Sequence, residues 1–399
     1  MMTSTTSSSP RVALVGVAGY AGVYFEWLSE AHRNGLVHLA AATILPAERQ
    51  LPAALELEHL ADKTYDCYEA MFEAEAGKID LCFIPTGIPW HAPMAIAAME
   101  AGANVLVEKP LAGSDADVRR VIAAEKQCKR WVAVGFQDMY TSELMELKQS
   151  LLNGIIGQIQ SVSMLGLWPR STAYYRRNAW AGKRELNGRS VMDSPLNNAF
   201  AHHVNLCLFL AGDTVSSSAA ATVVSSNLFR AHDIENFDTA VVSAASSDNG
   251  VAFWFGVTHA CFETVEPRIR IRGERGSVEW ERQGVCTIRP DDQDPVSIEV
   301  PQYSKSRQNM FEQVVSRLSD SNSFICDSQI AQSHAALIES IQRGADVKTV
   351  HSSNIETIKS DSDGHTIPAI KDINLLLQRT FETNSPLEDL SKKAVHLKQ

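Results

Sequence analysis

The sequence lacks the features that mark several large classes of protein. Its seven cysteines are spread singly and form no C-x-x-C pair, a pattern typical of reduced, mostly buried thiols in a cytosolic protein. Metal-ligand spacing is absent, and no run of about 18 apolar residues could cross a bilayer. The net charge of −11 at pH 7 argues against nucleic acid as a partner, because binding phosphates requires a basic face. We therefore expect a cytoplasmic protein without metal, membrane or nucleic-acid partner.

The length and the amino-terminal composition set the domain plan. The 399 residues suit two domains of ordinary size. Residues 1–10 are rich in Ser and Thr and have no basic region followed by an apolar run, so we expect a disordered tail and not a secretory signal. The rest of the chain has an ordinary globular composition, with 45% hydrophobic and 21% charged residues.

Strands and helices alternate between residues 11 and 137. The expected strands lie at residues 12–15, 37–44, 79–85, 104–107 and 131–136, and the expected helices around 25–31, 91–101 and 115–129. Such alternation predicts a parallel sheet with helices on both faces. The fold class we expect is therefore α/β here, an N-terminal Rossmann dinucleotide-binding domain.

The pattern changes after residue 137. A helix is expected at residues 142–153, strand-like runs at 159–167, 217–225, 239–245, 251–258, 268–272 and 277–281, and a polar loop at 344–364. These runs predict that residues 138–399 form an α+β domain with an open-faced, mostly antiparallel β-sheet. We expect this domain to bind substrate and to form a homodimer or homotetramer, because an open sheet face usually needs covering.

A turn of small residues joins the first strand to the first helix. In the G-x-G-x-x-G register Gly16 takes the first position, while Ala18 and Ala21 replace the other two glycines. Such a turn lets the backbone approach a pyrophosphate at a helix N-terminus, and the alternative is a tight turn that binds nothing. The candidate cofactor-binding residues in and beyond this turn are Gly16, Ala18, Gly19, Tyr20, Ala21, Thr86, His91, Glu108, Lys109 and Gln137.

The end of the second expected strand has no acidic residue to bind the ribose of NAD. It reads Ala-Thr-Ile-Leu-Pro over residues 42–46, and the nearest charges are Glu48 and Arg49. Without that acid nothing repels a 2′-phosphate, so both NAD and NADP are compatible, with NAD slightly favoured. Arg49 either binds such a phosphate or is a solvated loop residue, and we favour the second interpretation.

Glu108-Lys109-Pro110 follows the strand expected at residues 104–107. Ligands bind beyond the carboxyl ends of parallel strands, and this tripeptide lies there. A lysine in a cleft beside an oxidised nicotinamide would have a lowered pKa, which suits a general acid or base. Glu108 would hold this lysine or bind the cofactor ribose. For an isolated tripeptide of this kind, a surface salt bridge at a strand end would be the better interpretation.

The surroundings of that tripeptide resemble a known family. The stretch from Ile79 to Ala112, the junction Val134-Gly-Phe-Gln137 with Gly154 to Ile159, and the turn Gly273 to Ser277 are similar to the glucose–fructose oxidoreductase / inositol dehydrogenase (Gfo/Idh/MocA) family. The resemblance covers roughly residues 10–345. It implies a Rossmann domain with an open-faced sheet domain, bound NAD or NADP, sugar-like or polyol substrates, and Lys109 as the catalytic lysine.

The helix expected at residues 197–210 holds a second group of candidates. Asn198, His202 and Asn205 would lie on one polar stripe of an otherwise apolar helix. Members of the family carry Asp-x-x-x-His there, which implies that His202 acts beside Lys109 and places Asn198 at the aspartate position. Since an amide cannot stabilise an imidazolium by charge, Asp193 is the candidate to supply it. The alternative is that His202 and His203 are structural.

Residues 168–189 are rich in aromatic and basic side chains. Aromatic faces stack on sugar rings, while Arg and Lys bind hydroxyls or carboxylates, so an acidic sugar or a phosphate would fit. An oligomer interface is an equally good interpretation, because Tyr, Trp and Arg are enriched there too. The candidate substrate-binding residues are Lys109, Trp168, Tyr175, Arg176, Trp180, Asn198 and His202.

Together these features predict an NAD(P)-dependent oxidoreductase. It would transfer a hydride between the nicotinamide and a secondary alcohol of a sugar, sugar acid or polyol, with Lys109, His202 and Asp193 as the catalytic candidates. Two alternatives remain at this point. One is a redox-neutral enzyme that retains its cofactor and cleaves a sugar through a keto intermediate, and the other is a non-catalytic dinucleotide sensor.

Overall fold

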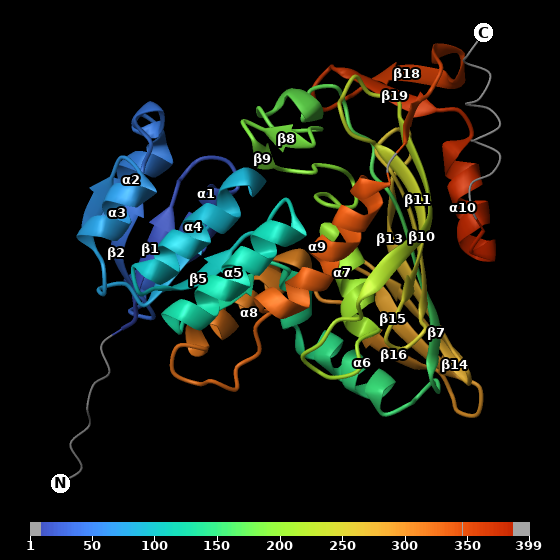
Figure 1. Ribbon diagram of the computed structural model, residues 1–399, viewed down its shortest axis with the longest axis horizontal. Helices are drawn as coiled ribbons and strands as arrows, with labels where there is room; N and C mark the ends of the chain where they lie inside the picture. Colours follow the sequence, from blue (N-terminus) through green and yellow to red (C-terminus); the bar gives the residue numbers. More distant parts are fainter. Residues whose placement is uncertain (1–8, 345, 386–399) are drawn as a thin grey trace. The chain divides into compact units, whose positions relative to one another are not determined.

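The computed structural model describes residues 9–344 and 346–385, which divide into two compact units (Figure 1). The first unit contains residues 9–112, 116–135 and 307–328, and the second contains 113–115, 136–306, 329–344 and 346–385. No helix in these ranges combines the length and the apolar character needed to cross a membrane.

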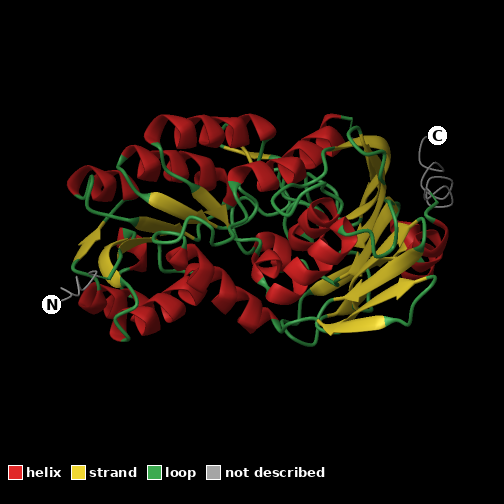
Figure 2. Ribbon diagram, turned by 90° about the horizontal axis from the view of Figure 1, so that it is seen from below, coloured by secondary structure: helices red, strands yellow, loops and turns green. Residues whose placement is uncertain are grey.

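The first unit is built on a six-stranded parallel sheet with the order β3-β2-β1-β4-β5-β6. The strands are β1 (Arg11–Val15), β2 (His38–Thr43), β3 (Lys63–Tyr65), β4 (Leu81–Ile84), β5 (Asn104–Val107) and β6 (Val132–Val134). The helices are α1 (Ala21–Arg33), α2 (Pro52–Leu60), α3 (Tyr68–Ala74), α4 (Ile88–Glu100) and α5 (Asp115–Cys128). Figure 2 shows helices on both faces of this sheet, which is why residues 12–15 of β1, 81–84 of β4, 105–107 of β5 and 132–134 of β6 are continuous apolar runs.

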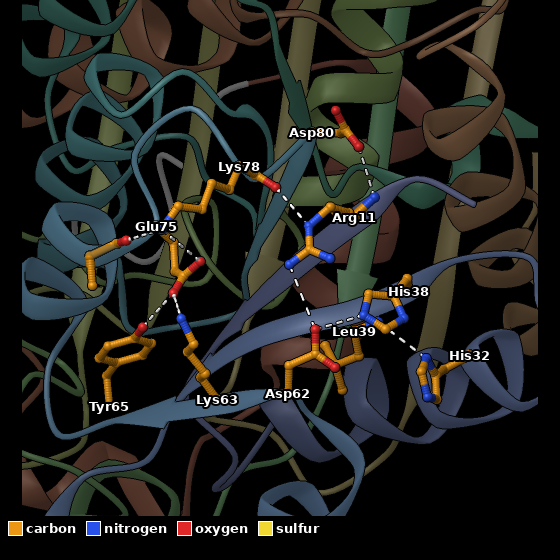
Figure 3. Close-up of polar contacts among 11 residues, drawn as sticks. Arg11, His32, His38, Leu39, Asp62, Lys63, Tyr65, Glu75, Lys78 and Asp80 are labelled. Atoms are coloured by element: carbon orange, nitrogen blue, oxygen red, sulfur yellow. Dashed lines mark hydrogen bonds and ion pairs between the residues drawn. The ribbon is translucent and has the colours of Figure 1, made fainter. Parts of the chain in front are cut away.

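Charged side chains connect the amino ends of these strands (Figure 3). The Arg11 backbone N–H donates to Asp80 at 2.8 Å, and its guanidinium donates to the Lys78 carbonyl at 3.1 Å. Asp62 lies 3.6 Å from the same guanidinium and 2.7 Å from the His38 imidazole. The strand order reverses between β1 and β4, so a ligand site is expected at their carboxyl ends, the edge opposite to these charges.

The first unit is completed by a segment from late in the chain. Helix α8 (Tyr303–Ser316) enters the unit at Arg307. The Phe311 ring stacks on Trp27 with centroids 4.7 Å apart and contacts Tyr24 edge-on at 4.8 Å. The boundary expected from the sequence, 11–137 against 138–399, does not include this return, because residues so far apart in sequence leave no periodic pattern.

The second unit contains a nine-stranded mixed sheet in the order β16-β15-β14-β13-β7-β12-β11-β10-β17. Its strands are β7 (Ile159–Leu167), β10 (Ala221–Arg230), β11 (Thr239–Ser246), β12 (Ala252–Thr258), β13 (Val265–Gly273), β14 (Gly276–Glu281), β15 (Val285–Pro290), β16 (Val296–Glu299) and β17 (Val347–Thr349). Pairing is antiparallel except for β7 with β12 and β10 with β17. The expected mostly antiparallel sheet is thus confirmed.

Helices and two short hairpins surround this sheet. They are α6 (Ser142–Leu152), α7 (Ala201–Leu210), α9 (Ser328–Arg343), α10 (Ile373–Thr383), β8 (Glu185–Leu186) with β9 (Arg189–Ser190), and β18 (Ile355–Lys359) with β19 (Thr366–Ile370). Figure 1 shows α7 and α10 on opposite faces of the sheet. We call the face toward α7 the inner face, since an added Cβ on Gly166 of β7 would collide with the Phe200 ring just before α7. The face toward α10 is the outer face.

Two expected elements in this unit were wrong. The strand expected at 217–225 runs over Ala221–Arg230, because Ser217 belongs to a turn in which its hydroxyl accepts a hydrogen bond from the Thr214 N–H. The segment expected as a loop at 344–364 contains β17 and β18. These strands are polar and mostly exposed, so they depend on their partners β10 and β19 and show no apolar alternation of their own.

Candidate functional site

The turn between β1 and α1 has the backbone of a phosphate-binding loop. Gly16 and Gly19 have φ angles of +88° and +61°, a region that favours glycine. A Cβ added to either would meet no described atom within 4 Å, so the turn is open on that side. Helix α1 follows with Tyr20 at its N-cap, and no described side chain caps it. A helix N-terminus suits an anion such as a pyrophosphate, because the positive end of the helix dipole lies there.

The end of β2 differs from the usual ribose site as the sequence predicts. Thr43 is the last residue of β2, and both its carbonyl and its hydroxyl accept from the Gly16 N–H, at 3.2 and 3.0 Å. Arg49 is not a solitary loop residue: its guanidinium pairs with Glu58 and, at 2.6 Å, with Asp66. With two carboxylates already beside it, this arginine is a poor ligand for an additional phosphate.

Lys109 lies at the carboxyl end of β5 on a turn fixed by a buried carboxylate. Glu108 is 5% exposed, and its two oxygens accept from the Tyr24 hydroxyl at 2.8 Å and from the Lys109 backbone N–H at 3.0 Å. A Cβ on Gly135 would lie 2.9 Å from the same carboxylate and 3.2 Å from the Tyr24 hydroxyl, so only glycine leaves room for this pair. The Glu108 side chain therefore fixes the backbone of this turn through its hydrogen bond with the Lys109 N–H. The Lys109 side chain is half-buried.

The charge of Glu108 is balanced within the first unit. Burial raises the pKa of its carboxyl group, and the charge of Lys109, the Tyr24 hydroxyl and the charge of Arg307 oppose that rise. Arg307 is the first residue of the returning segment, so the late part of the chain contributes to the electrostatics of this turn. The carboxylate fixes the backbone of the lysine that follows it.

His91 supports the same turn from α4. Its side chain is 1% exposed, with Nδ1 2.6 Å from the Pro110 carbonyl and Nε2 2.9 Å from the Thr86 carbonyl. The imidazole thus joins the segments that follow β4 and β5. Burial lowers its pKa, and the two carbonyl partners oppose that shift. His91 and the Thr86 carbonyl are occupied with this bridge, which gives His91 a structural role beside the lysine.

His202 lies in the first turn of α7 in the second unit. It is 7% exposed, and its ring is edge-on to Phe136 at 5.9 Å and to Tyr303 at 6.3 Å. His203 is 1% exposed and points elsewhere, against Trp280 at 5.8 Å and Trp168 at 6.0 Å. The two neighbouring histidines therefore have separate environments.

Asn198 does not share a helical stripe with His202, which corrects the expectation for residues 197–210. Helix α7 begins at Ala201, and residues 194–200 form successive turns. The Asn198 carboxamide donates to Asp193 at 2.8 Å, and the neighbouring Asn197 carboxamide donates to two backbone carbonyls. Such side-chain hydrogen bonds compete with helix formation and explain the late start.

Asp193 is buried at the centre of this loop. It is 3% exposed, and its second oxygen accepts from the Gly182 N–H at 2.6 Å. Its backbone carbonyl accepts from the Asn236 carboxamide at 2.9 Å. These bonds show that Asp193 holds the 182–198 loop together, while a direct action on His202 stays a prediction.

The aromatic and basic segment has an internal order that the sequence does not reveal. Trp168 is half-buried and stacks on Phe200 at 4.5 Å. The Tyr175 hydroxyl is 2.8 Å from Nδ1 of His259, and burial raises the pKa of this phenol well above its ordinary value. Trp180 is half-buried, and Arg176 is exposed. Tyr175 thus has a protein partner, while Trp168 and Trp180 keep part of their surfaces open.

Gln137 lies at the start of the segment 136–306 of the second unit, and its side chain has an unusual environment. Its side chain is fully buried, yet neither polar atom of the carboxamide has a hydrogen-bond partner among the described residues. A buried amide without partners is costly unless another group satisfies it. An added polar ligand such as a cofactor carboxamide would do so.

Sequence reasoning missed several residues that complete these groups. Tyr24 and Gly135 frame Glu108, while Tyr303 and Arg282 lie near the histidines, with the Arg282 guanidinium 5.1 Å from the Trp168 ring and 5.5 Å from the Tyr303 ring. Gly135 alone had a local signal, because it follows β6 at the carboxyl edge of the sheet. The others are brought to the site by packing between distant segments.

A turn fit for pyrophosphate on a parallel sheet, followed by a large mixed sheet, defines a two-unit dinucleotide-binding protein. A family model described as an oxidoreductase family with an NAD-binding Rossmann fold matches residues 10–136. A model of the GFO/IDH/MocA C-terminal domain matches residues 144–279. The chain belongs to the Gfo/Idh/MocA family of oxidoreductases.

Named relatives share parts of this chain. An inositol 2-dehydrogenase of Salmonella paratyphi B is 34% identical over 126 residues, 31% of this chain and 36% of the relative. A dTDP-3,4-didehydro-2,6-dideoxy-alpha-D-glucose 3-reductase of Streptomyces violaceoruber is 26% identical over 198 residues, 48% of this chain and 54% of the relative. The chain therefore spans between a third and about half of the length of these relatives.

Solved structures share the fold over most of the chain. An inositol dehydrogenase homologue of Azotobacter vinelandii, complexed with NAD⁺, has a TM-score of 0.70 at 17% identity and covers 85% of this chain and 97% of its own. The WlbA dehydrogenase of Bordetella pertussis, in complex with NADH and UDP-GlcNAcA, has a TM-score of 0.67 at 21% identity, with 84% and 98% covered. The cofactor of this chain is NAD or NADP, which fits the open glycine turn and the unpartnered Gln137.

Proposed function

We propose that this protein transfers a hydride between NAD(P) and a secondary alcohol of a sugar, sugar acid or polyol. The observation that carries the proposal is Lys109, a half-buried lysine on a turn fixed by Glu108 and His91. Such fixing is unnecessary for a surface salt bridge but is what proton transfer at a defined position requires. The carboxyl edge of the sheet is where this fold places reacting groups.

Each proposed role follows from the chemistry of the side chain. Lys109 is the acid or base that moves the proton of the substrate hydroxyl, and His202 orients the same oxygen. Asp193 is a positioning residue that acts through Asn198 and the loop it holds. The nicotinamide, when bound, accepts or supplies the hydride. Gly16 and Gly19 receive the pyrophosphate, and Gln137 binds a polar group of the cofactor.

The choice of substrate class rests on the second unit. Partly open faces of Trp168 and Trp180 suit the apolar face of a sugar ring, and the exposed Arg176 suits a carboxylate or phosphate on it. Relatives named for inositol and for a dTDP-sugar support a polyhydroxylated substrate, as does a neighbour bound to the acidic sugar nucleotide UDP-GlcNAcA. We propose NAD over NADP, because Arg49 is engaged by two carboxylates.

The first test is the absorbance of reduced nicotinamide with NAD and with NADP, across neutral, acidic and amino sugars and inositols. We expect a rise with NAD and one sugar or polyol class. A flat response from protein that demonstrably retains cofactor would contradict the dehydrogenase proposal. That result would favour the redox-neutral alternative, in which the cofactor is reoxidised in each turnover.

The second test is Lys109→Met. We expect a decrease in kcat of about 100-fold or more, because general acid–base catalysis contributes roughly 10²–10⁴. Cofactor affinity, followed by quenching of tryptophan fluorescence, should be nearly unchanged. Lys126→Met, at an exposed position on α5, is the matched control and should behave like the wild type. Near-normal turnover of Lys109→Met would remove the lysine from the mechanism.

A further inference from the structure

The outer face of the nine-stranded sheet carries one apolar strip. Leu165 and Leu167 of β7, Val241 of β11 and Trp254 of β12 form it, and each is at most 2% exposed. They pack against α10, whose buried residues Ile373, Leu377 and Phe381 recur at helical spacing. The residues between them, apart from the exposed Leu375, are polar or half-buried. Helix α10 therefore matches the strip with one apolar face and turns a largely polar face outward.

The outer face is charged on its β13–β14 side. On β13, Arg268, Arg270 and Arg272 point outward, and the register places Arg268 opposite Glu281 and Arg270 opposite Glu279 on β14. This ladder continues onto α10, because Arg270 pairs with Glu382 at 3.0 Å and lies 4.6 Å from the Phe381 ring. The strip under α10 is thus bordered by ion pairs on one side.

Polar contacts hold residues 384 and 385, which follow α10, on the same surface. The Trp254 indole N–H donates to the Ser385 carbonyl at 3.1 Å, and the Ser163 hydroxyl donates to Asn384 at 2.8 Å. Before α10, the Ile370 N–H donates to the Ala260 carbonyl at 3.0 Å. Residues 347–385, which we call the C-terminal arm, therefore add β17 to the edge of the sheet and then cross its outer face.

We propose that the C-terminal arm occupies the outer face in place of a second copy of this chain. Without α10 the face would present a tryptophan and several aliphatic side chains in one strip with a charged border, the composition of a self-association surface. The dimer or tetramer that an open sheet would favour therefore does not use this strip while the arm is in place. This inference is independent of the proposed reaction.

The test removes the match between α10 and the strip. Leu377→Glu combined with Phe381→Glu places charges against the strip, while Leu375→Glu, at a position 59% exposed on the same helix, is the matched control. We measure molar mass by light scattering during gel filtration at several concentrations, with circular dichroism to confirm folding. We expect the double variant to show at least twice the mass of the wild type with rising concentration, and the control to match the wild type. A folded double variant with unchanged mass would overturn the proposal.

A second experiment keeps the native sequence of α10. Cysteines are introduced at Ser163→Cys and Asn384→Cys, whose side chains are in hydrogen-bond contact, and are bridged by a short bismaleimide. We expect the bridged peptides to come from one chain, as shown by mass spectrometry of a mixture of ¹⁴N- and ¹⁵N-labelled protein. Bridges between labelled and unlabelled chains in a mixture that was unfolded and refolded together, or no bridges at all, would show that the arm does not lie on its own sheet.

Discussion

At the scale of single residues, the adjacent histidines of α7 separate a chemical role from a structural one. His202 borders Phe136 and Tyr303, whereas His203 is enclosed by Trp168, Trp280 and Phe200. The proposed function requires the first imidazole, and the packing of the inner sheet face requires the second. Substitution of each should therefore move a different observable.

We expect His202→Ala to lower kcat by about 100-fold, which is the usual loss when a side chain that takes part in proton transfer is removed. His203→Ala should instead lower the free energy of unfolding by about 2 kcal/mol or more, because it leaves a cavity among aromatic rings. Steady-state kinetics and urea denaturation of both variants check this. The reverse pattern would mean that His203 is the residue at the substrate.

The His91 bridge gives a second prediction at this scale. His91→Leu should remove the imidazole N–H that donates to one of the Thr86 and Pro110 carbonyls, at a cost of about 1–3 kcal/mol for the buried carbonyl left without a donor. Because the turn that holds Lys109 loosens, kcat should decrease more than substrate affinity. His91→Asn, which can still donate to one carbonyl, should recover part of both losses. Equal kinetics in the two variants would show that the bridge has no effect on Lys109.

The residues that sequence reasoning could identify share one property. Gly16, Gly19 and Lys109 lie where a strand ends, which the local pattern indicates, while the catalytic role expected of Lys109 is implied by the resemblance to the family. Tyr24 could not be found in this way, because its hydroxyl reaches Glu108 only after α1 packs against the sheet. Asn198 was misplaced, because its bond to Asp193 outweighs the helical pattern.

At the scale of elements, helix α7 is held at its end by a buried lysine. Lys148 of α6 is fully buried, and its ammonium group donates to the Phe209 carbonyl at 2.5 Å and to the Gly212 carbonyl. These carbonyls lie at the C-terminus of the helix, where a positive charge is favourable. Lys148 therefore connects α6 to the helix that carries His202.

Burial lowers the pKa of Lys148 to about 7, with the charge of Asp213 opposing the shift. An unfolded lysine with a pKa of about 10.4 then binds a proton that the folded protein has released, so stability rises from pH 7 toward pH 10. We expect the difference in unfolding free energy between wild type and Lys148→Met to grow by up to about 1.4 kcal/mol per pH unit in this window. Urea denaturation at pH 7, 8 and 9 measures it.

The comparison with Lys148→Met cancels the other titrating groups, since both proteins contain them. A difference that stays constant from pH 7 to 9 would mean that the two carbonyls keep the ammonium protonated. In that case the lysine stabilises the end of α7 as a charge, and burial does not release its proton. Circular dichroism at each pH confirms that both proteins start from the folded state.

Two strands whose apolar residues mark most of their length were predicted with accurate ends. Strands β5 and β7 have the bounds that the sequence predicts. Strands β17 and β18 were missed, because their residues are mostly exposed and gain order from β10 and β19. Polar strands at the edge of a sheet carry little signal of their own.

At the scale of the whole molecule, the two-unit plan followed from the change of pattern near residue 137. The return of residues 307–328 did not, because it depends on aromatic contacts of Phe311 with Tyr24, Trp27 and Phe83. The cover that α10 gives to the outer face was likewise beyond sequence reasoning. The amphipathic pattern of a helix predicts that one of its faces is buried, but it does not identify the surface on which that face packs.

The returning segment gives a prediction for stability. Phe311→Ala should lower the unfolding free energy of the first unit by about 3–5 kcal/mol, the usual cost of removing a buried phenylalanine. Trp27 stacks on this ring, so its fluorescence reports on the first unit during urea denaturation. Gln308→Ala, at an exposed position of α8, is the control and should change little. A loss below about 1 kcal/mol would show that the segment is not part of the core.

The return of the chain also has a consequence for synthesis on the ribosome. The first unit leaves the ribosome as far as residue 135 long before Phe311 is made, and 176 residues separate the two positions. At roughly 5–20 residues per second this delay is on the order of ten seconds or more. During that time Tyr24, Trp27 and Phe83 have no aromatic partner from the late segment, and Glu108 has no Arg307. The dinucleotide-binding unit, although first in the sequence, is thus completed only after most of the second unit has been made.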